Sequence, residues 1–413
     1  MPTSSRCASA PRRGRLRIAA DQTSTDHSVA APAPTDRLPG NVALVHDYLN
    51  QRGGAERVVL ELAAMFPGAP LYASLYRRES TFPEFAPLDI RTSFLDRIPV
   101  DRRFRALFPL YPAAFRSLGT IDAELVISSS SGWAHAVRTT PRAFHAVYCY
   151  TPPRWLYGDY MAPAAAQRVL SPFVGAFRSL DQRAARRPDL YIAISQLVRA
   201  RIRQRYGRDA PVVYPPVDVD RFAPTPRGDR LLVVSRLLPY KRVDVVVDAA
   251  TRAGLGLDVV GTGPAIADLR SRAGPTVRFL GRLPDADTTE LFQRCRAFCL
   301  PGTEDFGITP VEANAAGKPV VAFAGGGALE TIQSGVTGVF FGEHSVDALL
   351  EALRCCDAIS STPELIAQHA RTFSRGTFRE RLTTVLLEAI DDRRMQAPAA
   401  PGHQAKRVPV RGT

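Results

Sequence analysis

The spacing of Glu304 and Glu312 indicates that these two carboxylates could bind a ligand. They lie on either side of a Phe-Gly break in the stretch Leu300-Pro-Gly-Thr-Glu-Asp-Phe-Gly-Ile-Thr-Pro-Val-Glu-Ala-Asn-Ala-Ala-Gly-Lys318. An ion pair on a helix surface needs a spacing of three or four residues, and metal ligands usually come with further His, Cys or carboxylate residues. Neither pattern is present in this stretch. The two carboxylates therefore fit two separate hydrogen-bond acceptors at a strand-to-helix turn.

The same turn is suited to an anion. The apolar run that ends at Leu300 predicts a strand, and Thr309-Pro310 predicts the start of a helix with proline at its first position. Backbone amides at a helix start lack helical partners and attract phosphate groups. The amides expected to do so here are those near Gly307, Ile308 and Thr309.

Carboxylates beside a phosphate repel it unless they bind neutral hydroxyl groups. The pattern therefore indicates a nucleotide sugar, with one glutamate binding a ribose and the other a hexose. Two simpler explanations stay open. Thr309-Pro-Val-Glu312 matches a capping box, in which Glu312 bonds to a backbone amide, and Glu304 would then be a loop residue in water.

A phosphate site also needs cations. The run Ser235-Arg-Leu-Leu-Pro-Tyr-Lys-Arg-Val-Asp244 supplies Arg236 and Lys241 directly after a predicted strand at residues 231–234. Arg236 can bind phosphate oxygens with two donors, and Lys241 acts as a point charge. A solvated pair of basic residues is the alternative explanation.

The first half of the chain contributes a glycine turn. Arg52-Gly-Gly-Ala-Glu56 follows a predicted strand at residues 42–45. Gly53 and Gly54 would let backbone amides approach a ligand closely. A plain tight turn explains the same two glycines equally well.

A scaffold must bring these segments together, and the hydrophobic pattern predicts an α/β fold. Short apolar runs alternate with helical patterns in two series, which indicates two Rossmann-like domains with parallel sheets that face each other across a cleft. In such sheets ligands bind at the carboxyl ends of strands. The predicted strands are residues 42–45, 125–127, 146–148, 190–194, 231–234, 257–260, 277–280, 297–300 and 319–322, and the predicted helices include 57–65, 243–252, 287–296 and 378–390.

The proline-bearing run Val212-Val-Tyr-Pro-Pro-Val-Asp-Val-Asp-Arg-Phe222 suits a linker between the two series. Ser195 is expected to cap the helix that precedes it. The predicted division of the chain is residues 1–39 as a disordered basic tail, 40–222 as the first domain, 223–372 as the second domain, 373–393 as a final helix and 394–413 as a second disordered tail.

Composition narrows the class of protein. The chain has 413 residues, of which 45% are hydrophobic and 23% charged, and its six cysteines include no CxxC pair, so a reduced cytoplasmic protein is expected. The net charge of +13 fits an anionic membrane surface, anionic small molecules or simply arginine-rich codon usage. Nucleic-acid binding is disfavoured because the arginines are dispersed and no recognition motif is present. No apolar run reaches the length of a membrane span.

Three further features receive lesser roles. The segment Phe94–Phe115 mixes arginines with aromatic residues, which favours peripheral membrane contact or a lipid-linked acceptor as much as an ordinary solvated helix. Gly261-Thr-Gly-Pro264 lacks the third glycine of a dinucleotide fingerprint. Asp218-Val-Asp220 lies in the linker, where a metal site is not expected, and Cys295 with Cys299 is expected to be buried packing.

Residues 41–392 resemble the retaining, metal-independent glycosyltransferases of family four, the group 1 transferases with the GT-B fold. The motifs that carry the resemblance are Glu304-x7-Glu312 with Phe306-Gly307, the Ser-Arg-Leu-x3-Lys run, Gly-x-Gly-Pro at 261–264, Gly325-Gly-Gly327 and Tyr-Pro-Pro-Val-Asp before the second domain. The pattern His46-Asp-Tyr with Gly53-Gly-x-Glu56 is similar to a bacterial branch of mannosyltransferases.

The resemblance implies a role for each motif. Glu312 should bind the ribose, and Glu304 should bind the hexose and orient its anomeric carbon. The diphosphate should be bound by backbone amides and cations in place of a metal ion. The residues implied for donor binding or catalysis are Gly53, Gly54, Arg236, Lys241, Arg282 and Leu283 beside the base, Glu304, Phe306, Gly307, Ile308, Thr309 and Glu312, and no cofactor is implied.

By the same resemblance, the first domain binds the acceptor, the second binds the nucleotide sugar, and the final helix returns to the first domain. The implied activity is transfer of a hexose with retention to a glycan or lipid-linked acceptor, with GDP-mannose as the leading donor and UDP- or ADP-sugars as alternatives. No protein nucleophile is assigned. A non-catalytic nucleotide-sugar sensor on the same fold is the rival hypothesis. The enzyme would work in the cytoplasm, with the inner face of the membrane as an alternative site.

The chain departs from the family at one position. Related sequences commonly carry a histidine before Thr-Pro, where this chain has Tyr150. A tyrosine can donate a hydrogen bond to a hexose hydroxyl but carries no charge near neutral pH. The sugar contact is therefore open, with His46, His135 and His145 as the other candidates.

Overall fold

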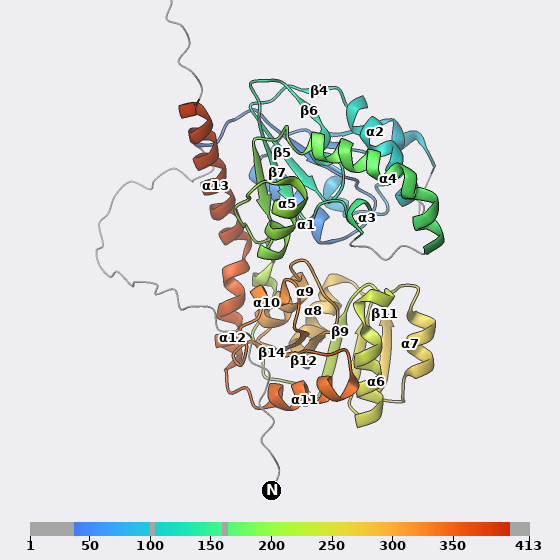
Figure 1. Cartoon of the computed structure of the whole chain (residues 1–413). Helices are drawn as coiled ribbons and strands as arrows, with labels where there is room; N and C mark the ends of the chain where they lie inside the picture. Colours follow the sequence, from blue (N-terminus) through green and yellow to red (C-terminus); the bar gives the residue numbers. More distant parts are fainter. Residues whose placement is uncertain (1–36, 100–103, 159–163, 397–413) are drawn as a thin grey trace, which may run out of the picture.

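Two parallel six-stranded sheets form the framework of the chain (Figure 1). The structure is a computed structural model, and it describes residues 37–99, 104–158 and 164–396. The strands are apolar runs because the sheets are covered on both faces by helices, as parallel sheets require. The predicted α/β class with two Rossmann-like domains is confirmed.

The first sheet has the strand order β3-β2-β1-β5-β7-β8, with all neighbours parallel. Its strands are β1 (Val42–His46), β2 (Leu71–Ala73), β3 (Ile90–Thr92), β5 (Leu125–Ser130), β7 (Phe144–Cys149) and β8 (Leu190–Ala193), and β4 (Thr120–Ile121) pairs separately with β6 (Arg138–Thr139). Its helices are α1 (Gly54–Met65), α2 (Tyr111–Ser117), α3 (Arg154–Tyr157), α4 (Ala164–Ala184) and α5 (Gln196–Tyr206). The strand order reverses between β1 and β5, so the switch point lies there.

The second sheet repeats this topology, with the order β11-β10-β9-β12-β13-β14 and its switch point between β9 and β12. Its strands are β9 (Arg230–Val234), β10 (Leu257–Val260), β11 (Val277–Gly281), β12 (Cys295–Leu300), β13 (Val320–Phe323) and β14 (Gly338–Phe341). Its helices are α6 (Val243–Ala253), α7 (Ile266–Arg272), α8 (Asp285–Arg294), α9 (Ile308–Ala315), α10 (Ala328–Thr331), α11 (Val346–Asp357) and α12 (Pro363–Ala370).

Short 3-10 helices complete the connections. They are η2 (Pro83–Phe85), η3 (Phe94–Arg97), η4 (Phe104–Leu110), η5 (Ala134–Ala136), η6 (Val219–Arg221), η7 (Pro239–Lys241) and η8 (Arg371–Phe373). Two of them matter for the site, because η6 ends the linker between the sheets and η7 follows β9 at the switch point.

The last helix, α13 (Arg375–Gln396), runs from the second domain along one side of the first (Figure 1). Near its start the Phe378 ring meets Tyr148 of β7 edge-on at 5.7 Å between centroids. Arg375 and Arg379 both form ion pairs with Glu61 of α1, which is almost fully buried. These contacts fasten the second domain to the helical face of the first.

The strand predictions were confirmed, although several strands run longer than the apolar pattern indicated. Ser195 caps α5 as predicted, since its hydroxyl accepts a hydrogen bond from the Val198 amide. The predicted helix over residues 287–296 is wrong at its end, because Cys295 already begins β12. The structure also adds β2, β3, β14 and α4, which the sequence analysis did not predict.

The prediction of disordered tails falls almost entirely outside the described residues, and so do Arg102 and Arg103 of the basic aromatic segment. Within that segment Tyr111 and Phe115 are buried in the first domain, so they serve its core. No helix in the described part of the chain combines the length and apolarity needed to cross a membrane.

Candidate active site

The switch point of the second sheet joins Lys241 and Glu304. Lys241 ends η7 after β9, and Glu304 lies in the loop after β12, 63 residues further along the chain. The Lys241 ammonium group donates a hydrogen bond to Glu304 Oε1. The Lys241 side chain is only 8% exposed and that of Glu304 28%, so the pair is partly shielded from water. A shielded ion pair is stronger than one in water, because the surrounding dielectric is lower.

The helix that follows Glu304 begins differently from the prediction. α9 starts at Ile308 with Gly307 as its N-cap, so Pro310 is the third helical residue and the prediction of proline at the first position is wrong. No side chain caps this N-terminus. The first-turn amides, those of Ile308 and Thr309 among them, therefore have no helical acceptor and carry the positive end of the helix dipole.

Glu312 does not complete a capping box, because the cap is Gly307 and not Thr309. Its carboxylate accepts a hydrogen bond from Arg221 of η6, at the end of the linker. Burial raises the pKa of Glu312, although the nearby charges of Arg221 and Arg57 oppose that shift. The sequence analysis missed Arg221, which stands next to Asp220 in the run taken as a linker.

The loop after β11 reaches the same region through Asp285. Asp285 begins α8 and accepts a hydrogen bond from Arg57 of α1 at 2.6 Å, and it lies 3.9 Å from Arg221. Arg221 thus connects the loop that contains Arg282 and Leu283 with Glu312. The structure brings Glu304, Lys241, Glu312 and the α9 N-terminus together, and it places Arg282 at the outer strand of the sheet.

Arg236 differs from Lys241 in its surroundings. It is exposed in the loop after β9, and its side chain has no ion-pair partner among the described residues. The glycines of the partial dinucleotide fingerprint support this loop, because a Cβ on Gly261 would lie 1.8 Å from the Ser235 carbonyl oxygen. Those glycines therefore serve close backbone packing.

The glycine turn of the first domain touches α9 of the second. Gly53 is the N-cap of α1, and a Cβ added to Gly54 would lie 2.6 Å from Ile308 Cδ1. Only glycine fits this approach without displacing Ile308. The N-termini of α1 and α9 therefore meet where the two domains face each other, and both are positive ends of helix dipoles.

Asp305, next to Glu304, is held by the first domain. Its carboxylate accepts from Arg201 of α5 at 2.6 Å and pairs with Arg154 of α3. Burial acts to lower the pKa of the Arg154 guanidinium, but the Asp305 carboxylate outweighs burial and raises it. None of the three residues was given a role from the sequence, although Asp305 adjoins Glu304 and Arg154 follows Tyr150 by four residues.

A second link between the domains runs through Glu330 of α10. Its carboxylate accepts hydrogen bonds from the amides of Gln196 and Leu197, at 2.8 Å and 3.2 Å, and from the Tyr214 hydroxyl at 3.2 Å. Glu330 thus caps α5 of the first domain from the second, where an acidic group suits the positive end of the helix.

The Tyr150 hydroxyl group forms its hydrogen bonds within the protein. This hydroxyl bonds to the Ala55 carbonyl oxygen at 3.1 Å and to Ser129 Oγ at 2.9 Å. Burial raises its pKa well above the usual value. Since one hydroxyl has one proton to donate, Tyr150 holds the glycine turn in place and is not free to bind a hexose in this arrangement.

The three candidate histidines lie in different places. His46 ends β1 beside the interface, with Nδ1 3.1 Å from Ser129 Oγ and Nε2 3.8 Å from Glu56 Oε1. His135 is buried 3.3 Å from Asp181. His145 lies at the opposite, amino end of β7, 2.8 Å from Ser128 Oγ. Of the three, only His46 both ends a strand and adjoins the glycine turn.

The Glu304 loop is backed by Gly325-Gly-Gly327. The Gly327 amide donates to the Glu304 carbonyl oxygen at 2.8 Å, and a Cβ on Gly326 would lie 2.3 Å from that same oxygen. Phe306 is buried, and its ring stacks on Tyr214 at 5.7 Å. Phe306 therefore anchors the loop from beneath.

Two family models match adjoining parts of the chain. The model described as Glycosyltransferase Family 4 matches residues 52–221, and the model described as Glycosyl transferases group 1 matches residues 220–371. Together they cover the second sheet, the first sheet except β1, and every residue of the site described above except those before residue 52.

Curated relatives are more distant. A GDP-mannose-dependent alpha-(1-6)-phosphatidylinositol monomannoside mannosyltransferase of Mycobacterium tuberculosis is 32% identical over 209 residues, which cover 43% of this chain and 54% of that protein. A D-inositol 3-phosphate glycosyltransferase of Kribbella flavida is 29% identical over 261 residues, covering 54% of this chain and 56% of that protein. The chain thus matches little more than half the length of these relatives.

Solved structures match nearly the whole fold. Sucrose-phosphate synthase from Thermosynechococcus elongatus superposes with a TM-score of 0.65 at 16% identity, over 85% of this chain and 99% of that one. Anabaena Alr3699/HepE in complex with UDP superposes with a TM-score of 0.62 at 20% identity, over 84% of this chain and 100% of that one. At this identity the likeness concerns the fold alone.

Proposed function

The chain belongs to the group 1 glycosyltransferases and has the GT-B fold, and from that premise we propose that it is an enzyme that transfers a hexose from a nucleoside diphosphate sugar to a glycan or lipid-linked acceptor. The observation that carries this proposal is the Lys241–Glu304 pair beside the uncapped N-terminus of α9. A cation, a carboxylate and free amides at one switch point suit a donor with a charged diphosphate and a neutral sugar.

In this proposal the leaving diphosphate is stabilised by fixed cations and dipoles. Lys241 and Arg236 supply the charges, and the amides of Gly307, Ile308 and Thr309 supply donors at a helix N-terminus. Groups already oriented toward the developing charge lower the barrier, because they need no reorganisation during the reaction. Gly53 and Gly54 bring the amides of the α1 N-terminus to the same place from the first domain.

The glutamates bind hydroxyl groups. Glu304 accepts from the hexose and orients its anomeric carbon, while Lys241 holds that carboxylate in position through its hydrogen bond. Glu312 accepts from the ribose and is oriented by Arg221. Arg282, Leu283 and Phe306 complete the donor site, with the first two beside the base and the Phe306 ring supporting the loop.

We further propose transfer with retention, by attack of the acceptor on the same face that the diphosphate leaves, and assign no protein nucleophile. GDP-mannose is the leading donor, because a curated relative is named as dependent on GDP-mannose. A UDP-sugar is the alternative, because a structural neighbour is titled as a complex with UDP-glucose.

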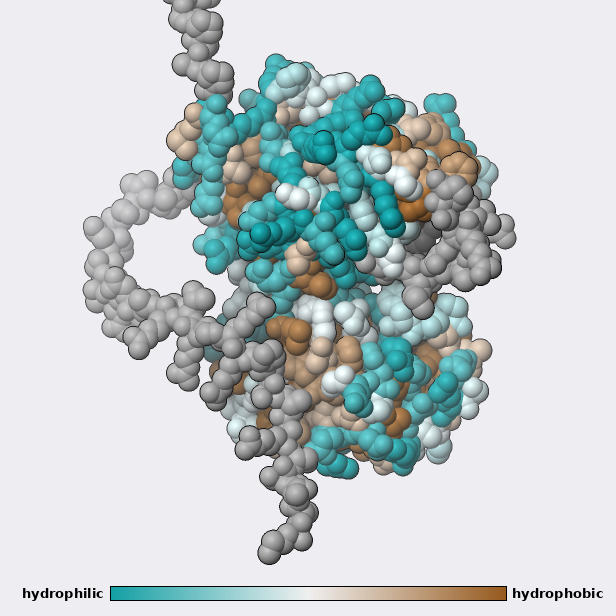
Figure 2. Space-filling view, viewed as in Figure 1, coloured by the Kyte–Doolittle hydropathy of each residue, from teal (hydrophilic) through white to brown (hydrophobic). Residues whose placement is uncertain are grey.

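Peripheral contact with an anionic membrane fits the acceptor side. Large apolar side chains are exposed on the first domain, including Phe173 and Leu180 of α4 at 62% and 37% and Leu110 at 42%. Figure 2 shows hydrophobic surface on the α2 and α4 side of this domain. A lipid-linked acceptor would present its sugar to the facing edge of the sheet while its lipid stays in the membrane.

The proposal is tested by incubating the protein with GDP-, UDP- and ADP-sugars in the presence and absence of acceptor glycans. Acceptor-dependent release of nucleoside diphosphate is expected for one donor, and the anomeric configuration of the product reports retention. A thermal-shift panel of the three diphosphates identifies the base. If a donor raised the melting temperature but was never consumed with any acceptor, a nucleotide-sugar sensor would replace the enzyme.

A further inference from the structure

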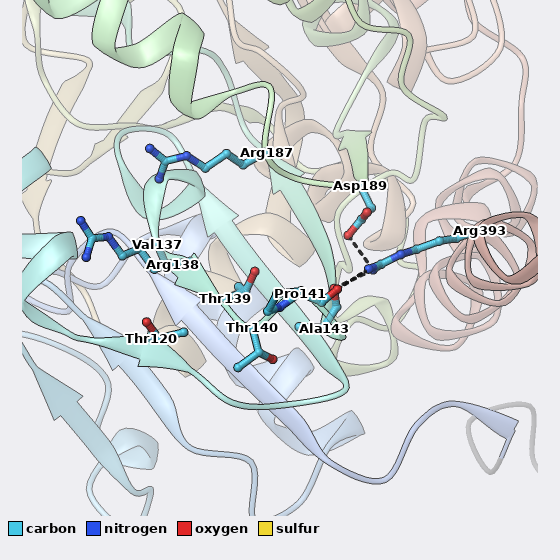
Figure 3. Close-up of a pocket in the computed structure, with 10 residues that line it drawn as sticks. All are labelled: Thr120, Val137, Arg138, Thr139, Thr140, Pro141, Ala143, Arg187, Asp189 and Arg393. Carbon is cyan, nitrogen blue, oxygen red and sulfur yellow. Dashed lines mark hydrogen bonds and ion pairs between the residues drawn. The ribbon is translucent and has the colours of Figure 1, made fainter. Parts of the chain in front are cut away.

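A polar cavity lies on the first domain, at the edge opposite the one that faces the proposed donor site. Its volume is about 420 Å³, which is within the range of small-molecule sites. The wall comes from β4 and β6, from the residues before β7 and β8, and from the end of α13 (Figure 3). Because β7 and β8 start here, the cavity is at the amino edge of the sheet.

The Arg393 side chain of α13 belongs to this wall and already has hydrogen-bond partners within the protein. Its guanidinium donates to the carbonyl oxygens of Ala143 and Pro141 at 2.6 Å and 2.8 Å, and to Asp189 Oδ2 at 3.0 Å. The same Asp189 oxygen accepts the His145 amide at 2.8 Å. The one carboxylate of the wall is therefore neutralised, and α13 is fastened to the cavity rim.

Two positive charges of the wall remain without a counter-charge. Arg138 of β6 and Arg187, which precedes β8, are both exposed, and neither side chain has a hydrogen-bond or ion-pair partner among the described residues. Figure 3 places both guanidinium groups on the side of the cavity away from the Asp189–Arg393 pair. The hydroxyl groups of Thr120 and Thr139 belong to the same wall.

We propose that this cavity binds an oxyanion with two negative charges, such as inorganic phosphate or a phosphate monoester. Guanidinium groups bind phosphate oxygens with two parallel donors, and threonine hydroxyls can donate to the remaining oxygens. An uncharged sugar would leave both arginines uncompensated, so charge selects the ligand class. The phosphate monoester can come from a free metabolite or from a lipid headgroup, which present the same chemistry.

The site is independent of the donor site. It lies at the opposite edge of the first sheet, so its ligand cannot be the leaving diphosphate or the reacting end of the acceptor. An anion bound between Arg138 and Arg187 would add a contact across the same cavity to which Arg393 fastens α13. The ligand would therefore favour the docked position of that helix.

The test uses the full chain saturated with its preferred nucleoside diphosphate, so that the donor site is filled. Calorimetric titration with inorganic phosphate is expected to show one site in the native protein and binding weakened about tenfold or more in the double variant Arg138→Gln/Arg187→Gln. Arg142→Gln is the matched control. Arg142 lies between the wall residues Pro141 and Ala143, but it pairs with Asp122 and is not part of the cavity wall.

A second arm separates the sources of the anion. Sedimentation with phosphatidylcholine vesicles is compared with sedimentation with vesicles that also contain phosphatidic acid, whose headgroup is a phosphate monoester. Loss of either phosphate binding or phosphatidic-acid binding in the double variant, with the control unchanged, supports the site and names its source. Native behaviour of the double variant in both arms overturns the proposal. Transferase turnover is expected to stay unchanged in the double variant, so failure here is distinct from failure of the proposed enzyme function.

Discussion

The two domains share one topology but use the edges that face each other differently. In the second domain the switch point between β9 and β12 presents Lys241, Glu304 and an uncapped helix. In the first domain the switch point between β1 and β5 is filled by polar side chains that bond to one another. Asp47, directly after β1, accepts from the amides of Ser131 and Ala134 at 2.5 Å and 2.9 Å.

The difference shows that topology determines where a site lies and side chains determine what it does. The first domain uses its buried carboxylate to shape a loop, whereas the second keeps its carboxylate partly exposed beside a cation. Glu56 of the first domain is as buried as Asp47, at 1% exposed. It differs from Asp47 because its Oε2 has no hydrogen-bond partner among the described residues. The comparison predicts catalytic defects from changes in the second edge and stability defects from changes in the first.

The largest effect is expected at the Lys241–Glu304 pair. Lys241→Ala and Glu304→Ala should each lower kcat about 10²–10³-fold, as removal of one preorganised charge-stabilising group commonly does. The measurement is nucleotide release at saturating donor, with Arg252→Ala as a control, since Arg252 pairs with Asp347 on the distant surface. Native turnover in both Lys241→Ala and Glu304→Ala would refute the assigned roles.

The next effect concerns the first edge and stability. Asp47→Ala leaves the amides of Ser131 and Ala134 without their acceptor in a buried region, so the free energy of unfolding should fall by about 3 kcal/mol. Nucleoside diphosphate affinity of the folded variant should stay close to native, because the proposed function assigns most of the diphosphate contacts to the second domain and none of them to Asp47. Urea unfolding and calorimetric titration measure the two quantities. Asp122→Ala, which removes an exposed pair with Arg142, should leave the free energy of unfolding nearly unchanged.

The strands could be predicted from the sequence where burial on both faces forces a continuous apolar run. β1 reads Val-Ala-Leu-Val-His, and all five residues are buried. β2 and β3 were missed because each has three residues and lies toward the sheet edge, where little of the chain needs to be apolar. The helix α4 was not predicted, and its sequence contains Pro172 and Gly175, two residue types that disfavour a helix interior.

The meeting of the Glu304 loop after β12 with the Lys241 segment after β9 could be predicted, because parallel sheets bring strand ends to one edge. The partners of the Glu304 loop in the first domain could not be predicted. Arg154 and Arg201 reach Asp305 only because the two domains pack against each other, and no spacing within either domain encodes this contact. The role of Tyr150 was likewise left open from the sequence, because its hydroxyl bonds to the Ala55 carbonyl oxygen, and a backbone acceptor leaves no trace in the sequence.

Acid should weaken the first domain through His145. Burial lowers the pKa of His145 from 6.5 to about 3, with the charges of His135 and Arg208 adding to the shift. The unfolded chain therefore binds a proton that the folded protein excludes, so stability is full above pH 6.5 and is lost as the pH falls toward 3.

This linkage predicts that the free energy of unfolding of the native protein falls by on the order of 2 kcal/mol from pH 7 to pH 5. The same fall should be absent in His145→Gln. Urea unfolding at both pH values measures it. The control is His344→Gln in the second domain, whose ring stacks on Phe323 at 3.9 Å. An unchanged pH dependence in His145→Gln would show that other groups account for the acid sensitivity.

The smallest effect is expected at the contact that Asp305 of the second domain makes with the first domain. Asp305→Asn removes the charge that Arg154 and Arg201 share, which weakens the contact between the Glu304 loop and the first domain. Since Asp305 adjoins Glu304 and is not among the residues proposed to bind the donor, kcat should fall about five- to tenfold, equivalent to about 1 kcal/mol. The nucleoside diphosphate dissociation constant should change less than about twofold.

Asp209→Asn is the matched control for this prediction, because Asp209 pairs with Arg199 entirely within the first domain. Small-angle scattering should show a larger radius of gyration for Asp305→Asn than for Asp209→Asn, since only the former breaks a contact between domains. If the two variants had equal turnover and equal size, the Asp305 contact would be a surface feature without influence on the Glu304 loop. The site would then be complete within the second domain, and the first domain would serve only to bring the acceptor.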